Sequence, residues 1–348
     1  MPDLLSILVE KRGSDLHLAA GKTPAMRVDG AIHRMHGLGT VDHAWMAAEA
    51  ERLGPRYDAE EFARRASADF GVTEAGRRFR VNLFRSAGGL ALVARLLEDE
   101  FRDFEALGLP RQVERFAEYE SGLVLICGAT GSGKSTSLAS IVNRINETSA
   151  RHILTIEDPI EYVHEDRGGI VRQRELNADT PDFASAVRAA LREDPDVILV
   201  GEMRDVETMR AALTAAETGH LVLSTLHTGD VVGSVRRLVG AFPAEEQDAA
   251  RLRVSQSTRA VMAQHLLPAR GGGRTPAVEL MFLTTAIRHL IAANKLDQIQ
   301  SAVESGGAEG MRTLEQSLAG LVREGLIHAE TAEAHCRDPD AMARLLRR

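Results

Sequence analysis

A chain of 348 residues is too long for one ordinary domain, and about 150 residues per domain suggests two. The apolar share of 44% supplies a core for each, which excludes a globally disordered chain. Basic residues number 42 against 50 acidic ones, so a protein that coats nucleic acid is disfavoured. The two cysteines, Cys127 and Cys336, are far apart, which excludes a disulfide framework and a cysteine zinc site. Without a signal-peptide pattern or an apolar run near the ~18 residues of a membrane span, we expect a soluble cytoplasmic protein.

Residues 1–105 alternate short strand-like and helix-like pieces, a pattern typical of an α+β domain with antiparallel pairing. Turn signals at Asp29-Gly30 and Gly88-Gly89 join neighbouring strands. A helical segment follows Pro110, and residues 106–121 are expected to link this domain to the next. The expected elements are strands at residues 14–19, 25–28, 79–84 and 90–97 and a helix at residues 45–53.

From residue 123 the pattern changes to continuous apolar runs separated by helical stretches, which indicates parallel strands buried on both faces. After about residue 230 the chain reads as mostly helix, with a flexible loop at residues 268–276. Residues 122–348 are therefore predicted to form one α/β domain with a helical C-terminal part. The expected strands are residues 123–127, 153–156, 197–200 and 221–225, and the later helices are residues 284–293, 312–324 and 330–346.

The strongest motif is GATGSGKS at residues 128–135, which fits G-x-x-x-x-G-K-[ST] between an apolar strand and a helical stretch at 136–145. Glycines let backbone N–H groups curl around a phosphate, and the helix N-terminus adds partial positive charge. The motif predicts binding of ATP and Mg²⁺, with Lys134 on the β- and γ-phosphates and the Ser135 hydroxyl on the metal. A plain glycine turn is the alternative. The candidate nucleotide-binding residues here are Gly128, Ala129, Thr130, Gly131, Ser132, Gly133, Lys134, Ser135 and Thr136.

Two of the predicted strands end in glutamates, at the edge where a doubly wound sheet binds its ligands. Glu157 follows residues 153–156, and Glu202 follows residues 197–200 after Gly201. Hydrolysis needs a group that orients and deprotonates water and a carboxylate near Mg²⁺. We assign Glu157 to the water and Glu202 to Mg²⁺, directly or through water. The two roles could be exchanged, and two solvated loop carboxylates are the alternative.

His220 and His227 bracket the predicted strand at residues 221–225. His227 lies just past the carboxyl end, where it could report the γ-phosphate, and His220 is a further candidate nucleotide ligand; structural roles are the alternative. In the first domain, arginines crowd one hairpin-like region, either as a solvated basic face or as arginine fingers for a neighbouring subunit's nucleotide. They are Arg77, Arg78, Arg80, Arg85 and Arg95.

Together these residues resemble the type II and type IV secretion ATPase superfamily, most closely its PilT-type pilus retraction branch, over nearly the whole chain. GSDLHL at 13–18, RVDG at 27–30 and GRRFRVN at 76–82 look like the PAS-like first domain of that family. The phosphate loop matches its Walker A motif. The other matches are TIEDPIE at 155–161 to its Asp box, LREDPDVILVGEMRD at 191–205 to its Walker B, and residues 215–228 to its His box.

The resemblance implies a PAS-like α+β domain followed by a RecA-like P-loop ATPase domain with a helical C-terminal region. It implies a homohexamer that hydrolyses ATP with Mg²⁺ and drives pilus retraction and twitching motility by turning an inner-membrane platform protein of the PilC type. Such a motor acts in the cytoplasm at the inner-membrane base of the pilus. Arg80 and Arg95 fit the family's phosphate-contacting arginines best.

The lack of a four-cysteine zinc module favours the retraction branch over the extension and type II secretion branches. One departure is AIRHLI at residues 286–291, where His289 replaces the asparagine of the retraction signature AIRNLI. The alternatives are an accessory PilU-like paralogue that works with a related ATPase, a secretion-system ATPase, and a non-hydrolysing structural ring. A RecA-like nucleic-acid translocase is disfavoured by the negative charge, and no nucleic acid is expected as a partner.

Overall fold

The structure, a computed structural model, describes residues 3–54, 59–97 and 100–347, with side chains 59–61 left out. Contacts divide the chain into two compact units. The N-terminal unit contains Met1–Glu100 together with two later segments, Glu157–Glu165 and Gln173–Asp182. The C-terminal unit contains the remaining segments, Phe101–Ile156, Asp166–Arg172 and Phe183–Arg348.

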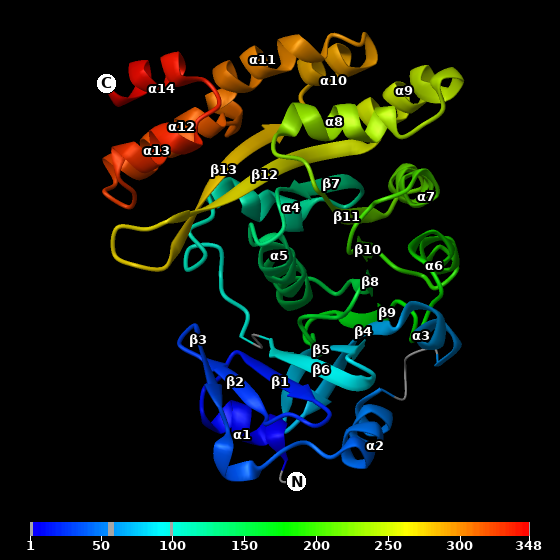
Figure 1. The fold of residues 1–348 in the computed structure, drawn as a ribbon. Helices are drawn as coiled ribbons and strands as arrows, with labels where there is room; N and C mark the ends of the chain where they lie inside the picture. The colour runs from blue at the N-terminus through cyan, green and yellow to red at the C-terminus, as the bar shows by residue number, and fades with distance from the viewer. Residues whose placement is uncertain (1–2, 55–58, 98–99, 348) are drawn as a thin grey trace. The chain divides into compact units, whose positions relative to one another are not determined.

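The N-terminal unit is built on a six-stranded antiparallel sheet in the order β3-β2-β1-β6-β5-β4 (Figure 1). The strands predicted in this region are confirmed, and β3 and β4 are additional. All positions of β3 are exposed, so it carries no alternating apolar signal. The elements are β1 (Asp15–Ala19), β2 (Ala25–Val28), β3 (Ala31–Arg34), β4 (Ser67–Glu74), β5 (Arg77–Ser86) and β6 (Gly89–Leu96), with α1 (Leu4–Glu10), α2 (His43–Leu53) and α3 (Ala59–Arg65).

The two faces of this sheet differ because successive side chains of a strand point to opposite sides. Phe79, Val81 and Leu83 of β5 are fully buried in a core that also includes residues of α1 and α2. Arg78 and Arg80 alternate with them and therefore point to the other face. One face is thus a core, and the opposite face carries charged side chains.

One buried ion pair joins the later segments to the N-terminal sheet. A terminal nitrogen of Arg78 lies 2.5 Å from Glu175 Oε2, and the two side chains are 9% and 1% exposed. Glu175 also accepts hydrogen bonds from the backbone N–H groups of Gly71 (2.9 Å) and Ile160 (3.2 Å). Arg78 Nε donates to the Ile160 carbonyl at 3.0 Å. The carboxylate of Glu175 and the guanidinium of Arg78 therefore find their hydrogen-bond partners within the N-terminal unit.

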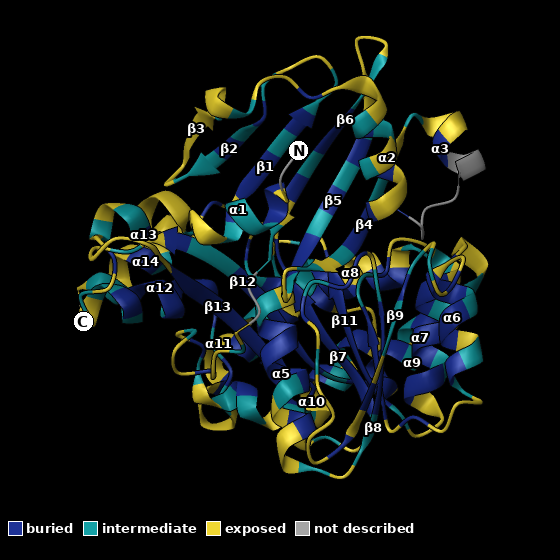
Figure 2. Cartoon of the chain, turned by 90° about the horizontal axis from the view of Figure 1, so that it is seen from below, coloured by how far each residue is buried: buried dark blue, intermediate teal, exposed yellow. Residues whose placement is uncertain are grey.

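The C-terminal unit is built on a seven-stranded sheet in the order β13-β12-β7-β11-β10-β8-β9. The strands from β12 to β8 run parallel, and β13 pairs antiparallel with β12. The four strands predicted here are confirmed, and β7 and β11 are buried along their whole length (Figure 2). The strands are β7 (Gly122–Cys127), β8 (His152–Glu157), β9 (Ile170–Glu175), β10 (Val197–Val200), β11 (Leu221–Leu226), β12 (Thr258–Pro268) and β13 (Arg274–Phe282).

Helices connect these strands and follow the hairpin β12–β13. No helix in the described part of the chain has the length and apolar character needed to cross a bilayer. The helices are α4 (Arg115–Glu118), α5 (Lys134–Thr148), α6 (Phe183–Ala190), α7 (Val206–Glu217), α8 (Val231–Gly240), α9 (Gln247–Ser257), α10 (Thr285–Ala292), α11 (Ile299–Ser305), α12 (Leu314–Arg323), α13 (Ala329–His335) and α14 (Pro339–Leu346).

The prediction of mostly helix after residue 230 is wrong for residues 258–282, which form the hairpin β12–β13. Both faces of β12 are largely buried, so its apolar run has no period of two and resembles a buried helix. The predicted flexible loop is the hairpin turn between Pro268 and Arg274. The helix expected at residues 330–346 is two helices, because Asp338 caps α14 and Pro339 occupies its first turn.

Glu175→Gln tests the buried ion pair, because it leaves the Arg78 guanidinium buried beside a neutral amide. We expect the free energy of unfolding of the N-terminal unit to fall by about 3–5 kcal/mol. The readout is urea unfolding followed by the fluorescence of Trp45, the chain's single tryptophan, which packs on this core. Asp297→Asn is the control, since its pair with Arg236 is exposed on both sides. Equal losses in the two variants would contradict the assignment.

Candidate functional site

The parallel strands of the C-terminal sheet end at one edge, which gathers the predicted motifs. Cys127 of β7 pairs with Leu226 of β11, and Val200 of β10 pairs with Ser224 of β11 and Ile156 of β8. The residues that follow or end these strands at that edge are the phosphate loop after β7, Glu157 at the end of β8, Glu202 after β10 and His227 after β11.

The loop between β7 and α5 needs glycine at both of its ends. Gly133 has a φ of 88°, a left-handed conformation that L side chains rarely adopt. A Cβ added to Gly128 would lie 2.4 Å from Ser132 Oγ and 2.5 Å from the backbone oxygen of Gln264. Cys127, directly before the loop, is fully buried, and burial raises the pKa of its thiol to about 11. The backbone of the loop is therefore closely confined.

Lys134 begins α5, and its side chain folds back over the loop. The Nζ atom donates hydrogen bonds to the carbonyl oxygens of Gly128 (2.8 Å) and Ala129 (2.9 Å). The side chain is largely buried, and this desolvation lowers the pKa of Lys134, while the carboxylate of Glu202 is among the charges that oppose the shift. An ammonium is thus held at the N-terminal end of a helix, where the helix dipole also favours an anion.

Ser132 adds a further sign that the loop suits an oxygen-rich anion. Its hydroxyl oxygen is buried and has no hydrogen-bond partner within the described protein. Buried hydroxyls are almost always paired in folded proteins. An orphaned hydroxyl, a buried ammonium and a glycine cradle together fit phosphate oxygens. Four other predicted residues of the loop and the start of α5 are exposed to solvent: Ala129, Thr130, Gly131 and Ser135.

The structure brings Glu202 and His227 together beside this loop. His227 Nε2 lies 3.3 Å from Glu202 Oε2, and Arg204 lies 2.6 Å from the other carboxylate oxygen. The Glu202 side chain is 13% exposed, whereas His227 is about half exposed at 48%. Thr225 supports this turn, because its hydroxyl donates to the Gly201 carbonyl at 2.6 Å. The two residues form a carboxylate–imidazole pair that remains open to a ligand.

The structure does not bring His220 to this site. His220 precedes β11, and Leu221 pairs with Gly122 at the start of β7. The phosphate loop follows the other end of β7, so a whole strand of ~20 Å separates the two places. The His220 ring instead contacts the Ala215 carbonyl at 3.0 Å, where it closes the end of α7. Within one chain the structure therefore places His220 away from the phosphate loop, and its role as a nucleotide ligand stays a prediction.

Glu157 is positioned by contacts inside the N-terminal unit. Gln173 Nε2 donates to Glu157 Oε1 at 3.1 Å, and the backbone N–H of Leu176 donates to the Glu157 carbonyl at 2.9 Å. Gln173 was missed by the sequence analysis because it lies outside every motif. An amide donor on one carboxylate oxygen orients the Glu157 side chain.

The arginines of the first domain separate into different roles. Arg78 is committed to Glu175, and the Arg85 guanidinium lies 5.7 Å above the Phe62 ring. Arg80 and Arg95 face each other across β5 and β6. Both are partly exposed, at 38% and 66%. Of the predicted cluster, these two therefore lie side by side on the charged face.

Acidic partners hold this arginine pair in place. Asp69 accepts from Arg80 Nε and Nη2 at 3.0 and 2.5 Å, and this hydrogen bonding raises the pKa of Arg80. Asp15 is a buried carboxylate that accepts from Arg95 Nε at 2.8 Å and lies 3.7 Å from Arg27 Nε. The sequence analysis missed Asp15 and Asp69; the alternation of β1 and β4 is the signal that places them on this face.

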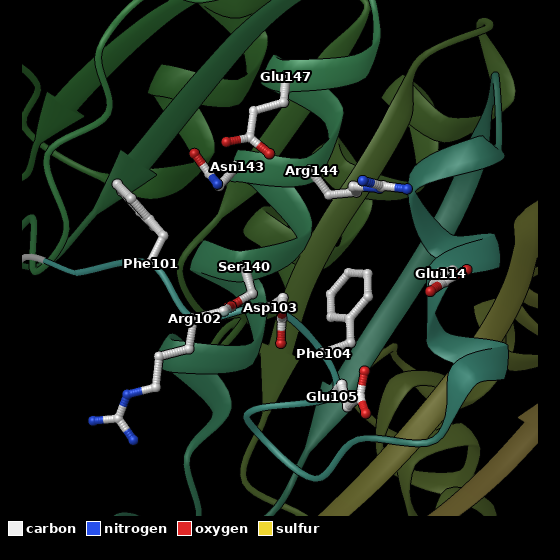
Figure 3. A pocket seen from close by; sticks show the side chains of 10 residues that line it. All are labelled: Phe101, Arg102, Asp103, Phe104, Glu105, Glu114, Ser140, Asn143, Arg144 and Glu147. Carbon is white, nitrogen blue, oxygen red and sulfur yellow. The ribbon is translucent and has the colours of Figure 1, made fainter.

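A pocket of about 410 Å³ lies along α5 (Figure 3). Its carboxylates outnumber its guanidinium groups, which disfavours a phosphate there. No predicted site residue lines it, so we place the phosphate site at the N-terminal end of α5 instead. The lining residues are Phe101, Arg102, Asp103, Phe104, Glu105, Glu114, Ser140, Asn143, Arg144 and Glu147.

Comparisons with known proteins agree with this geometry. The chain is 46% identical to the type IV pilus retraction ATPase PilT of Pseudomonas aeruginosa, over 97% of this chain and 98% of that protein. It is 49% identical to a twitching motility protein of Neisseria gonorrhoeae, over 76% of this chain and 71% of that protein. The crystal structure of the pilus retraction motor PilT with bound ADP superposes with a TM-score of 0.90, at 42% identity and 98% coverage of both chains.

The similarity to PilT includes the fold, a PAS-like N-terminal domain and a RecA-like ATPase domain, as the sequence analysis predicted. Residues 65–270, more than half of the chain, match the family of type II/IV secretion system proteins. Both the motifs and the geometry of the phosphate loop are those of a P-loop ATPase. The chain belongs to the type II/IV secretion system protein family.

Proposed function

We propose that this chain is an ATP-hydrolysing motor of the PilT type that drives retraction of a type IV pilus and thereby twitching motility. The observation that carries the proposal is the placement of Lys134, Glu202 and His227 at the carboxyl edge of one parallel sheet. The similarity to a pilus retraction ATPase, 46% identical over nearly the whole chain, supports retraction as the process that the motor drives.

The first step is the capture of the nucleotide phosphates by the loop at residues 128–136. The Lys134 ammonium, already desolvated and bonded to Gly128 and Ala129, exchanges carbonyl oxygens for phosphate oxygens. No group of three or more His, Cys, Asp or Glu in the described part of the chain could hold a metal alone. The Ser135 hydroxyl and the Glu202 carboxylate are the groups that would hold Mg²⁺ beside the nucleotide phosphates. When bound, Mg²⁺ neutralises charge on the β- and γ-phosphates.

Hydrolysis then needs a base for the attacking water. Glu157, oriented by Gln173, is the proposed base, and Glu202 organises the shell of Mg²⁺. His227 contacts Glu202 and is half exposed, so it is placed to report the γ-phosphate to the segment that leads into α8.

Arg80 and Arg95 are proposed to act on a nucleotide held by a neighbouring subunit of a homohexamer. Their place opposite each other on β5 and β6, with both side chains partly exposed and each bonded to a carboxylate, supports this role. In this proposal residues 1–105 are the PAS-like domain, residues 106–121 are the linker, and residues 122–348 are the ATPase domain.

The proposed partner is an inner-membrane platform protein of the PilC type, which places the motor at the cytoplasmic base of the pilus. A paralogous ATPase is a further proposed partner. The non-hydrolysing ring is disfavoured, because Lys134, Glu157 and Glu202 are all present.

Lys134→Ala and Glu157→Gln test the ATPase proposal. We expect phosphate release to fall by about 10³-fold or more in each variant, because the first loses the phosphate contact and the second loses the base. The measurement is phosphate release with size-exclusion light scattering on the same sample. A hexamer of the unmodified protein that releases no phosphate would contradict the proposal and favour the accessory role.

His227→Ala and His220→Ala form a matched pair that tests the placement of the site. His227→Ala is expected to lower kcat by about 10²-fold, since it removes a polar group beside Glu202. His220→Ala should leave kcat unchanged, because it lies at the opposite edge of the sheet. Steady-state kinetics provides the readout, and a larger loss for His220→Ala would place the active site elsewhere.

The trans role of the arginines is tested by mixing two inactive variants. Arg95→Ala hexamers and Lys134→Ala hexamers are dissociated, mixed and reassembled. Some interfaces then join an intact phosphate loop to an intact Arg95, so activity should return. If Arg95 serves the nucleotide of its own subunit, the mixture stays as inactive as its components.

A further inference from the structure

Gln264 lies beside the phosphate loop, although it belongs to β12, more than a hundred residues later in the chain. β12 runs parallel to β7, with Met262 opposite Ile126 and Ala263 opposite Cys127. Gln264 is therefore level with Gly128, the first residue of the loop. Its side chain is buried, with only 3% of the residue exposed. Because this region was expected to be helical, the sequence analysis did not connect Gln264 with the loop.

The Gln264 side chain contacts the first turn of α5. Ser137 Oγ donates a hydrogen bond to Gln264 Oε1 at 2.8 Å, and Ser137 is 1% exposed. Ser137 lies one turn after Lys134 on the same helix. Because both groups are buried, removal of either partner leaves a polar atom that neither water nor protein satisfies.

Gln264 also limits the space at both ends of the loop. A Cβ added to Gly133 would lie 2.7 Å from Gln264 Nε2, and one added to Gly128 would lie 2.5 Å from the Gln264 backbone oxygen. The loop therefore packs directly on this residue at the two glycines where its chain direction changes.

We propose that Gln264 is a positioning residue for nucleotide binding, which holds the phosphate loop and the first turn of α5 in the shape that receives phosphates. It acts through Gly128, Gly133 and Ser137, and does not itself contact the reacting atoms. The inference rests on the proposed function, because it assumes that the loop binds nucleotide.

The test measures the affinity of the purified full chain for a fluorescent ADP analogue with Mg²⁺, well below the midpoint of thermal unfolding. Gln264→Met keeps the bulk but removes both polar groups, and Ser137→Ala removes the donor. Each variant is expected to raise the Kd about tenfold, because each leaves one buried polar partner unpaired. The Kd of the double variant should be no higher than that of the single variant with the higher Kd, because both changes break the same contact.

Ser317→Ala is the matched control. Ser317 of α12 is a buried serine in the C-terminal unit, like Ser137. Its hydroxyl accepts a hydrogen bond from the backbone N–H of Val278 in β13 at 2.9 Å. It should lower the unfolding midpoint in the same way as Ser137→Ala while leaving the Kd unchanged. This comparison separates a role in binding from a general loss of stability.

Lys134→Ala distinguishes the failure of the inference from the failure of the proposed function. If Lys134→Ala binds the analogue as tightly as the unmodified chain, the loop is not the nucleotide site and both fail. If Lys134→Ala loses binding while folded Gln264→Met and Ser137→Ala keep the original Kd, only the inference is overturned. Effects of the two variants that multiply in the double variant would also overturn it.

Discussion

The common direction of β12, β7, β11, β10 and β8 is the constraint on which the site depends. The carboxyl ends of parallel strands lie at one edge of the sheet. Strand pairing alone therefore brings residues that are far apart in the sequence together there. Backbone hydrogen bonding and apolar burial supply the alignment. The sheet does not depend on the polar residues that follow each strand. Their side chains can therefore be those that binding and catalysis require.

In the N-terminal unit one ion pair, between Arg78 and Glu175, is buried on both sides. Arg78 and Glu175 satisfy each other and two backbone N–H groups, and the segments from 157 to 165 and from 173 to 182 belong to the N-terminal unit. The proposed base, Glu157, lies in the first of these segments. Its setting is thus built by the N-terminal unit, although its strand belongs to the C-terminal sheet.

Local patterns predicted the strands that bury one face or lie at the centre of the sheet, and they predicted a loop between a buried strand and a helix at GATGSGKS, although the helix begins at Lys134 and not at residue 136. They failed where burial has no period, as in β12, and where a strand is wholly exposed, as in β3. His227 lies beside Glu202 at the carboxyl end of β11, whereas His220 lies at the other end, as their order around the predicted strand implies. Gln173 and Gln264 could not be found from spacing, because their partners are fixed only by the pairing of strands far apart in the sequence.

Cys127 gives this protein a built-in chemical reporter. Its thiol is fully buried at the end of β7, and its raised pKa keeps it protonated near neutral pH. An alkylating reagent reaches it only when the strand end opens, so the modification rate measures local opening at the root of the phosphate loop. Cys336, partly exposed near the C-terminus, offers an internal reference on the same molecule. The rate at which Cys127 is alkylated therefore measures how often the carboxyl end of β7 opens to solvent.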